Sequence, residues 1–264
     1  MIYLSYLDLV LAAILVLLLG LLSFRLERHL GRQIVIAAAR TTVQLLLIGL
    51  VLKLLFAQSH WFWVMLMAAV MWLLAGREVQ ARQQYRLGRG WGYGIGTLSM
   101  FSSSLVVILF ALIVIIQQKP WYAPQYAIPL LGMLLGNTMN GVSLALDRFH
   151  REVWQQRNAI EARLILGQTS YEAIRDVQRA AVHAGFIPIV NAMSAAGVIS
   201  LPGMMTGQIL AGAPPVEAVK YQILIMFLIA VGTGLGTLAA VRLSAGRVFD
   251  ERERLRLDRI VARS

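Results

Sequence analysis

Long apolar stretches alternate with short polar segments along most of this chain. A helix that crosses a hydrocarbon core about 30 Å thick needs roughly 20 residues, and these must be mostly apolar. Five stretches meet both conditions, and they are 2–24, 34–56, 96–116, 126–146 and 223–243. We expect each of them to form a membrane-spanning helix.

Two shorter apolar stretches extend this set. Residues 61–76 carry Trp61 and Trp72 near their two ends, and tryptophan is enriched at membrane–water interfaces. Residues 186–201 precede a Pro-Gly pair and give a further candidate. The apolar stretch 204–212 is too short to cross, so we expect it to be re-entrant or interfacial. The whole pattern predicts an all-α, polytopic membrane protein with about seven transmembrane helices.

The distribution of positive charge predicts the orientation. The chain has 264 residues, is 58% apolar and only 14% charged, and has a net charge of +11. Cytoplasmic loops of membrane proteins are enriched in Lys and Arg. With the N-terminus outside, 20 of the 24 Lys and Arg fall in inner segments, namely 25–33, 77–92, 147–185 and the tail from Arg242. We therefore predict a multi-pass protein of the inner (cytoplasmic) membrane, with its N-terminus outside and its C-terminus cytoplasmic.

This distribution accounts for the basic character of the chain, so we expect membrane lipid and no nucleic acid around it. No internal repeat divides the sequence, and we expect one transmembrane domain over residues 1–264. Within it, 147–185 is predicted to be a cytoplasmic loop and 244–264 a cytoplasmic tail. The charge pattern of the tail predicts an amphipathic helix exposed to solvent.

The chain lacks the motifs of several enzyme classes. A P-loop requires Gly-Lys followed by Ser or Thr, but none of the three lysines, Lys53, Lys119 and Lys220, follows a glycine. There is no cysteine, and the four histidines are scattered, so we interpret them as loop or interface residues rather than metal ligands. We expect no enzyme and no cofactor bound by this chain, which leaves transport or signalling.

The predicted cytoplasmic loop has the pattern of two helices. Gly167 fits a helix C-terminus, and Thr169 with Glu172 three residues later fits a capping box that starts a second helix. We expect Gly185 to end that second helix. The apolar positions are Phe149, Val153, Ile160, Leu164 and Ile165 in the first helix, and Ala173, Ile174, Val177, Ala180 and Ala181 in the second. The segment either lies on the bilayer surface or docks into the groove of a partner protein.

Several stretches of this sequence resemble a known family. Glu161-Ala162-Arg163 followed by Gly167 resembles the EAA loop of bacterial ABC-transporter permeases, in which Glu-Ala-Ala and a spaced Gly form the coupling helix. Arg163 stands where that loop has its last Ala. The stretches 38–52, 129–149 and 200–222 extend the resemblance, and together they are similar to the FetB family of permeases assigned to iron export, whose plant relatives are linked to aluminium tolerance.

The resemblance implies the permease subunit of an ABC transporter, a homodimer that associates with a separate ATP-binding cassette subunit. ATP would bind to that partner, and its closure would push on the segment 161–185 and switch the spans between inward and outward access. The residues of this chain that would carry the coupling are Glu161, Ala162, Gly167, Thr169 and Glu172. The resemblance also implies export of iron, or of another metal ion or its complex.

Polar side chains inside predicted spans are candidates for the transport pathway, because they are costly in lipid. With one methionine added, the candidates are Arg40, Gln44, Asn137, Asn140, Asn191 and Met193. Arg40 and Gln44 are four residues apart and therefore share a helix face. Simpler roles stay open, since an arginine can snorkel to the interface, amides can join helices and methionines can fill a core.

Two other function classes stay open. The chain could be a self-sufficient secondary transporter or channel, although such proteins usually show internal repeats or charges in the middle of their spans. It could also be a structural or signalling membrane protein. No Asp or Glu lies within a predicted span away from its ends, whereas hard cations prefer carboxylate oxygen. The assignment of iron therefore depends on the resemblance alone.

Overall fold

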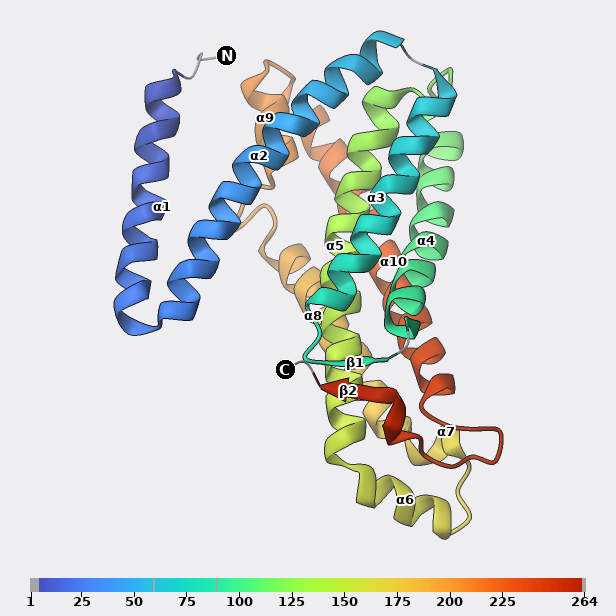
Figure 1. Cartoon of the computed structure of the whole chain (residues 1–264). Coiled ribbons are helices and arrows are strands. Elements are labelled where there is room, and N and C mark those ends of the chain that lie inside the picture. The colour runs from blue at the N-terminus through green and yellow to red at the C-terminus, as the bar shows by residue number, and fades with distance from the viewer. Residues whose placement is uncertain (1–4, 59, 89, 263–264) are drawn as a thin grey trace. The chain divides into compact units, whose positions relative to one another are not determined.

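The computed structural model of the chain describes residues 5–58, 60–88 and 90–262 (Figure 1). It divides into two compact units, one ending at His60 and the other beginning at Trp61. Both units are built almost entirely of helices. The prediction of an all-α, polytopic membrane protein is therefore confirmed.

The first unit is an antiparallel pair of helices, α1 (Tyr6–Leu26) and α2 (Arg28–Gln58). The α1 helix begins with a capping box, in which the Ser5 amide donates to a carboxylate oxygen of Asp8 at 2.8 Å. The two backbones come close at Gly31, where a Cβ atom would lie 2.7 Å from the carbonyl oxygen of Gly20. Most described side chains of this unit are exposed, as expected for helices that face lipid or another chain.

The second unit is a bundle of five long helices, and they are α3 (Trp61–Ala81), α4 (Trp91–Phe110), α5 (Pro124–Gln155), α8 (Arg175–Ala195) and α10 (Pro215–Arg247). The α5 helix packs against the other four (Figure 1). Residues 111–116 continue the α4 helix in π-helical form.

Six helices of the described chain are long and apolar enough to cross a membrane. They correspond to the five long stretches of the sequence and to the stretch that begins at Trp61. The additional span predicted over 186–201 differs from the structure. The α8 helix ends at Ala195, and its first turns are polar and charged, so only its second half is apolar. The next helix, α9 (Gly203–Leu210), has eight residues and is too short to cross, as predicted.

The C-terminal tail is not a helix, and that prediction is wrong. After α10 the chain turns and runs through a short 3₁₀ helix (Leu257–Arg259) into the strand β2 (Ile260–Ala262). This strand pairs antiparallel with β1 (Tyr85–Leu87), which lies between α3 and α4. The charges of the tail are paired locally, for example Arg254 with Asp250, and therefore do not form the polar face of a helix.

One end of the second unit has a core of its own, formed where the loop and the tail meet the bundle (Figure 1). Its fully buried side chains include Phe149 and Val153 of α5, Ile160 of α6 (Arg157–Ile165) and Ile174 just before α8. The tail contributes Val248, Phe249 and Ile260. Loop and tail are therefore folded onto the bundle and form part of its structure. We call this end, with the loop and the tail, the loop end of the bundle.

Candidate functional site

The loop between α5 and α8 turns sharply at Gly167, after the helix α6. We call this turn and the residues on either side of it the elbow. The α6 helix ends in a Schellman motif, in which the Gln168 amide donates to the Arg163 carbonyl at 3.1 Å and the Gly167 amide to the Leu164 carbonyl at 3.0 Å. Gly167 has φ = +90°, a conformation that side chains with a Cβ rarely adopt. The predicted stop at Gly167 is confirmed.

The next helix, α7 (Ser170–Ala173), begins with the predicted capping box. The Glu172 amide donates to the Thr169 hydroxyl oxygen at 3.3 Å, and the Thr169 amide donates to the Glu172 carboxylate at 3.0 Å. These hydrogen bonds from Thr169 hold the pKa of Glu172 below its usual value. The elbow therefore has a defined stop on one side and a defined start on the other.

Arg163 ties the two sides of the elbow together. Its guanidinium donates to the Ala173 carbonyl at 3.1 Å and forms an ion pair with Asp176 at 3.2 Å. The sequence showed this arginine only as a departure from the Glu-Ala-Ala pattern. In the structure it crosses from α6 to the end of α7 and the start of α8, a role that alanine could not fill.

The tip of the elbow presents apolar side chains to the surroundings. Ile165 is 86% exposed, Leu166 82% and Tyr171 57%. Glu161 and Ala162 are also exposed on α6. Ile165 is one of the apolar positions that the sequence assigned to the first helix, and it is exposed, whereas the buried residue of α6 is Ile160. We call Ile165, Leu166 and Tyr171 the apolar tip.

The second helix of the loop does not end at Gly185, contrary to the prediction. The α8 helix continues through Gly185 to Ala195, and Gly185 is buried against α5. A Cβ atom on Gly185 would lie 2.8 Å from the carbonyl oxygen of Gly141. This glycine allows two helix backbones to touch, and a single sequence does not distinguish that role from a helix stop.

The polar candidates for a pathway fall in both units. Arg40 and Gln44 lie on α2 of the first unit, and both are exposed. Asn137 and Asn140 are exposed on α5, and Asn191 is exposed on α8.

The two α5 amides already have protein partners. The Asn137 amide nitrogen donates to the carbonyl of Met133 at 2.8 Å, and Asn140 accepts a hydrogen bond at 2.6 Å from Arg82, the residue that follows α3. Arg82 is a polar partner that the sequence did not reveal, because it lies outside the predicted span. The interpretation of Asn140 as a residue that joins helices is thereby supported, and its role in a pathway stays a prediction.

Met193 lines a largely apolar cavity of about 590 Å³ between α8, α9 and α10. Met205 and Met226 line the same cavity, and so does Gln222, whose buried side-chain oxygen has no hydrogen-bond partner among the described residues. An amide oxygen without a partner is costly in an apolar surrounding. The cavity therefore places methionine sulfur atoms and an amide oxygen next to Met193, a candidate from the sequence.

Three threonine hydroxyl groups are buried in the interior of the bundle. Thr138 of α5 and Thr233 and Thr237 of α10 are almost fully buried, and their hydroxyl oxygens have no hydrogen-bond partner among the described residues. Thr138 belongs to the polar cluster of the sequence that contains the candidates Asn137 and Asn140, whereas Thr233 and Thr237 were not candidates. Their signal was weak, because Thr and Gly alternate along α10 as in any close helix contact.

Metal-binding side chains do not gather in the described part of the chain, where no group of three or more His, Cys, Asp or Glu could hold an ion. His150 is buried within the helix α5 and does not lie in a loop. Its Nδ1 lies 3.1 Å from the carbonyl oxygen of Tyr85 and its Nε2 lies 2.7 Å from the hydroxyl of Ser244. It therefore joins α5 to β1 and to the end of α10.

Comparison with known proteins agrees with the fold. Residues 6–249 match the model of the family UPF0014, described as an uncharacterised protein family. The UPF0014 membrane protein slr1647 of Synechocystis is 41% identical over 231 residues, which are 86% of this chain and 87% of that protein. The "Probable iron export permease protein FetB" of Escherichia coli is 30% identical over 253 residues, 94% of this chain and 93% of its own length.

A plant protein is similar as well. ALUMINUM SENSITIVE 3 of Arabidopsis thaliana is 32% identical over 216 residues, 81% of this chain and 77% of that protein. No solved structure matches the chain. The family match extends from α1 through the spans and the elbow to the start of the tail. This chain therefore belongs to the UPF0014 family of membrane proteins.

Proposed function

We propose that this chain is the membrane permease subunit of an ABC transporter, driven by a separate ATP-binding subunit that docks on the elbow. The observation that carries the proposal is the apolar tip. Ile165 and Leu166 are more than four-fifths exposed in a segment that is otherwise fixed by caps, an ion pair and a buried core. Large apolar side chains held rigidly in water are typical of a protein interface.

The architecture of the elbow supports a mechanical role. Force applied at Ile165 or Leu166 would pass through the Schellman turn and Arg163 to α8, and through Ile160 and Phe149 to α5. Both of these long helices belong to the bundle and α5 is one of its candidate spans, so closure of a bound subunit would move that span. The coupling residues proposed from the resemblance are Glu161, Ala162, Gly167, Thr169 and Glu172, and all lie in or next to this elbow.

The substrate proposed is iron, or another metal ion or its complex, and the direction proposed is export. The name of the Escherichia coli relative supports this choice. The methionine-lined cavity gives a first place to look for contacts, since thioether and amide groups can meet a soft ion or a complexed one. We propose a homodimer in the cytoplasmic membrane, with the loop end of the bundle on the cytoplasmic side.

The test uses two matched substitutions. Ile165→Ser and Ile199→Ser change the same residue type at nearly equal exposure, 86% and 85%. Ile165 lies in the loop before α8 and Ile199 in the turn after it, so the helix α8 separates the two sites along the chain. Each variant is co-expressed with the ATP-binding subunit of the same organism, purified through a tag on this chain, and assayed for bound subunit and ATP hydrolysis.

We expect Ile165→Ser to lose most of the bound subunit and of the ATP hydrolysis, while Ile199→Ser keeps both. Equal retention by the two variants would contradict docking at the apolar tip. Flux of metal into liposomes that contain this chain alone, without ATP, would instead favour the self-sufficient transporter or channel. Metal content of cells that lack both subunits tests the substrate separately.

A further inference from the structure

A second feature of the loop end is independent of transport. The strand β1, the start of α4, the end of α10 and the tail enclose a cavity of about 360 Å³. Three arginines line it, together with one carboxylate and one tryptophan, and they are Arg247, Arg256, Arg259, Asp258 and Trp91. The lining therefore carries an excess of positive charge.

Arg247 is held in place by the tryptophan ring. Its guanidinium carbon lies 3.2 Å from the centre of the Trp91 ring, which is a close cation–π contact. Among the described residues no carboxylate pairs with Arg247. Stacking fixes the plane of the guanidinium and leaves its N–H groups available to a ligand, an arrangement that suits recognition of phosphate.

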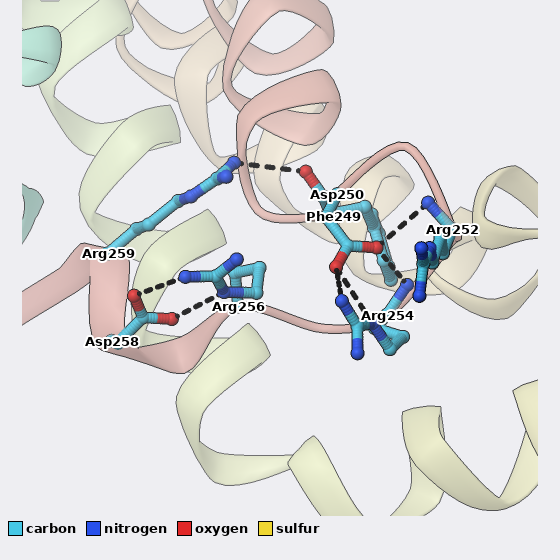
Figure 2. Close-up of polar contacts among 7 residues, drawn as sticks. All are labelled: Phe249, Asp250, Arg252, Arg254, Arg256, Asp258 and Arg259. Carbon is cyan, nitrogen blue, oxygen red and sulfur yellow. Dashed lines mark hydrogen bonds and ion pairs between the residues drawn. The ribbon is translucent and has the colours of Figure 1, made fainter.

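The other two arginines are also fixed, as Figure 2 shows. Arg256 forms two parallel hydrogen bonds of 2.9 Å with Asp258, which offset that carboxylate. One terminal nitrogen of Arg259 donates to the carbonyls of Arg247 and Phe249 at 2.8 and 3.1 Å. These contacts use only part of the Arg259 fork, because a guanidinium has five N–H donors. The cavity thus has two charges beyond its internal ion pair.

The position of the cavity at the ends of two candidate spans indicates where a ligand would come from. Trp91 is the first residue of a candidate span and Arg247 is the last residue of another. Tryptophan at the end of a span is typical of the lipid headgroup region. Basic pockets between helices on the cytoplasmic side are suited to acidic lipid headgroups, and the positive-inside distribution predicts that this end is cytoplasmic.

From this arrangement we propose that the cavity binds the phosphate of an anionic phospholipid of the cytoplasmic leaflet. The stacked guanidinium of Arg247 would bind the phosphate, and Arg259 would provide a second positive charge. The indole ring of Trp91 would lie next to the acyl-chain region. Because the tail supplies Arg256 and Arg259 while α10 and α4 supply Arg247 and Trp91, a bound headgroup would hold the tail onto the bundle.

The test is a lipid titration of the purified full chain in neutral detergent. Phosphatidylglycerol, phosphatidylcholine and sodium phosphate are added separately, with the thermal unfolding midpoint and native mass spectrometry as readouts. The variant is Arg247→Gln, and the control is Arg252→Gln. The control removes the same charge from the tail, at an exposed position that does not line this cavity.

We expect phosphatidylglycerol to raise the midpoint and to stay bound, while phosphatidylcholine does neither. Loss of one charge-assisted contact should weaken the apparent affinity of Arg247→Gln roughly tenfold and leave Arg252→Gln unchanged. If Arg247→Gln does not fold, Trp91→Leu replaces it, with weaker binding again expected. Equal binding by the variant and the control would overturn the site. Equal protection by millimolar phosphate would overturn the lipid and identify a site for the free anion.

Discussion

The contact between α5 and α8 makes a sharp prediction about Gly141. This glycine is buried where the two helix backbones touch. A Cβ atom on Gly141 would lie 2.5 Å from the Thr233 methyl carbon and 2.8 Å from the Gly185 carbonyl oxygen. Ordinary contact begins near 3.4 Å, so the Gly185 backbone would have to move by about 0.6 Å, the difference between 3.4 and 2.8 Å.

The threonine methyl group can rotate away, but the carbonyl oxygen belongs to a helix and moves only with it. Overpacking of this kind costs about 1–3 kcal/mol. Alanine in place of a helical glycine contributes about 0.5–1 kcal/mol in the opposite direction. Gly136, also on α5, is exposed and has nothing within 4 Å of its Cβ position, so Gly136→Ala carries the same propensity gain without the overlap.

The difference between the two variants therefore isolates the cost of the overlap. In a chain of this size each kcal/mol corresponds to about 2–4 °C in the unfolding midpoint. We expect Gly141→Ala to unfold several degrees below Gly136→Ala when both are purified in the same detergent. Equal midpoints would refute the inference that the backbones of α5 and α8 touch at Gly141.

Three further changes test other parts of the loop end. His150→Leu removes the hydrogen-bond partner of the buried Ser244 hydroxyl, and we expect a loss of about 1–3 kcal/mol in unfolding free energy; an unchanged midpoint would contradict this. Thr169→Ala removes the cap of α7, which should cost about 1 kcal/mol and speed hydrogen exchange in 170–173, whereas unaltered exchange would show that the cap is dispensable. The pKa of Asp250 is lowered to about 2 by hydrogen bonds from Arg254. Because this folded value is below that of the unfolded carboxyl, its contribution is complete above pH 4 and is lost as the pH falls towards 2. Exchange of the Arg254 amide, corrected for its intrinsic rate, should rise over that interval in the wild type, and an even profile would count against the assignment.

The spans could be predicted because their signal is local. A stretch such as 223–243 is apolar for long enough that few structures other than a membrane helix remain. The elbow was also predictable, since the stop at Gly167 and the box from Thr169 to Glu172 are set by residues close in sequence. In each case the physical cause lies within one or two turns of helix.

What the sequence did not reveal depends on contacts between distant residues. The strand Tyr85–Leu87 has three residues and forms because β2 pairs with it from the end of the chain. The tail has charges at helical spacing, yet they pair with one another, as Arg256 does with Asp258. Gly185 looked like a stop because its packing partner, Gly141, is 44 positions earlier in the chain.

The candidate pathway is the part that the sequence predicts least. Asn140 proved to have an arginine partner just after α3, whereas Thr233 and Thr237, whose hydroxyls have no partner in the described part of the chain, were not anticipated. Polar residues in a span are visible in the sequence, but whether each already has a partner depends on how the helices are packed. The candidates Arg40, Gln44, Asn137, Asn191 and Met193 stay predictions.

The pairing of β2 with β1 also has a consequence for the order in which the protein is made. Ile260 is part of the same buried cluster as Phe149 and Ile174, which are synthesised about a hundred residues earlier. The spans can enter the membrane one after another, but the loop end cannot close its core until the chain beyond α10 has left the ribosome. A chain interrupted after its last span would therefore be fully inserted, yet the buried cluster on which the elbow packs would be incomplete.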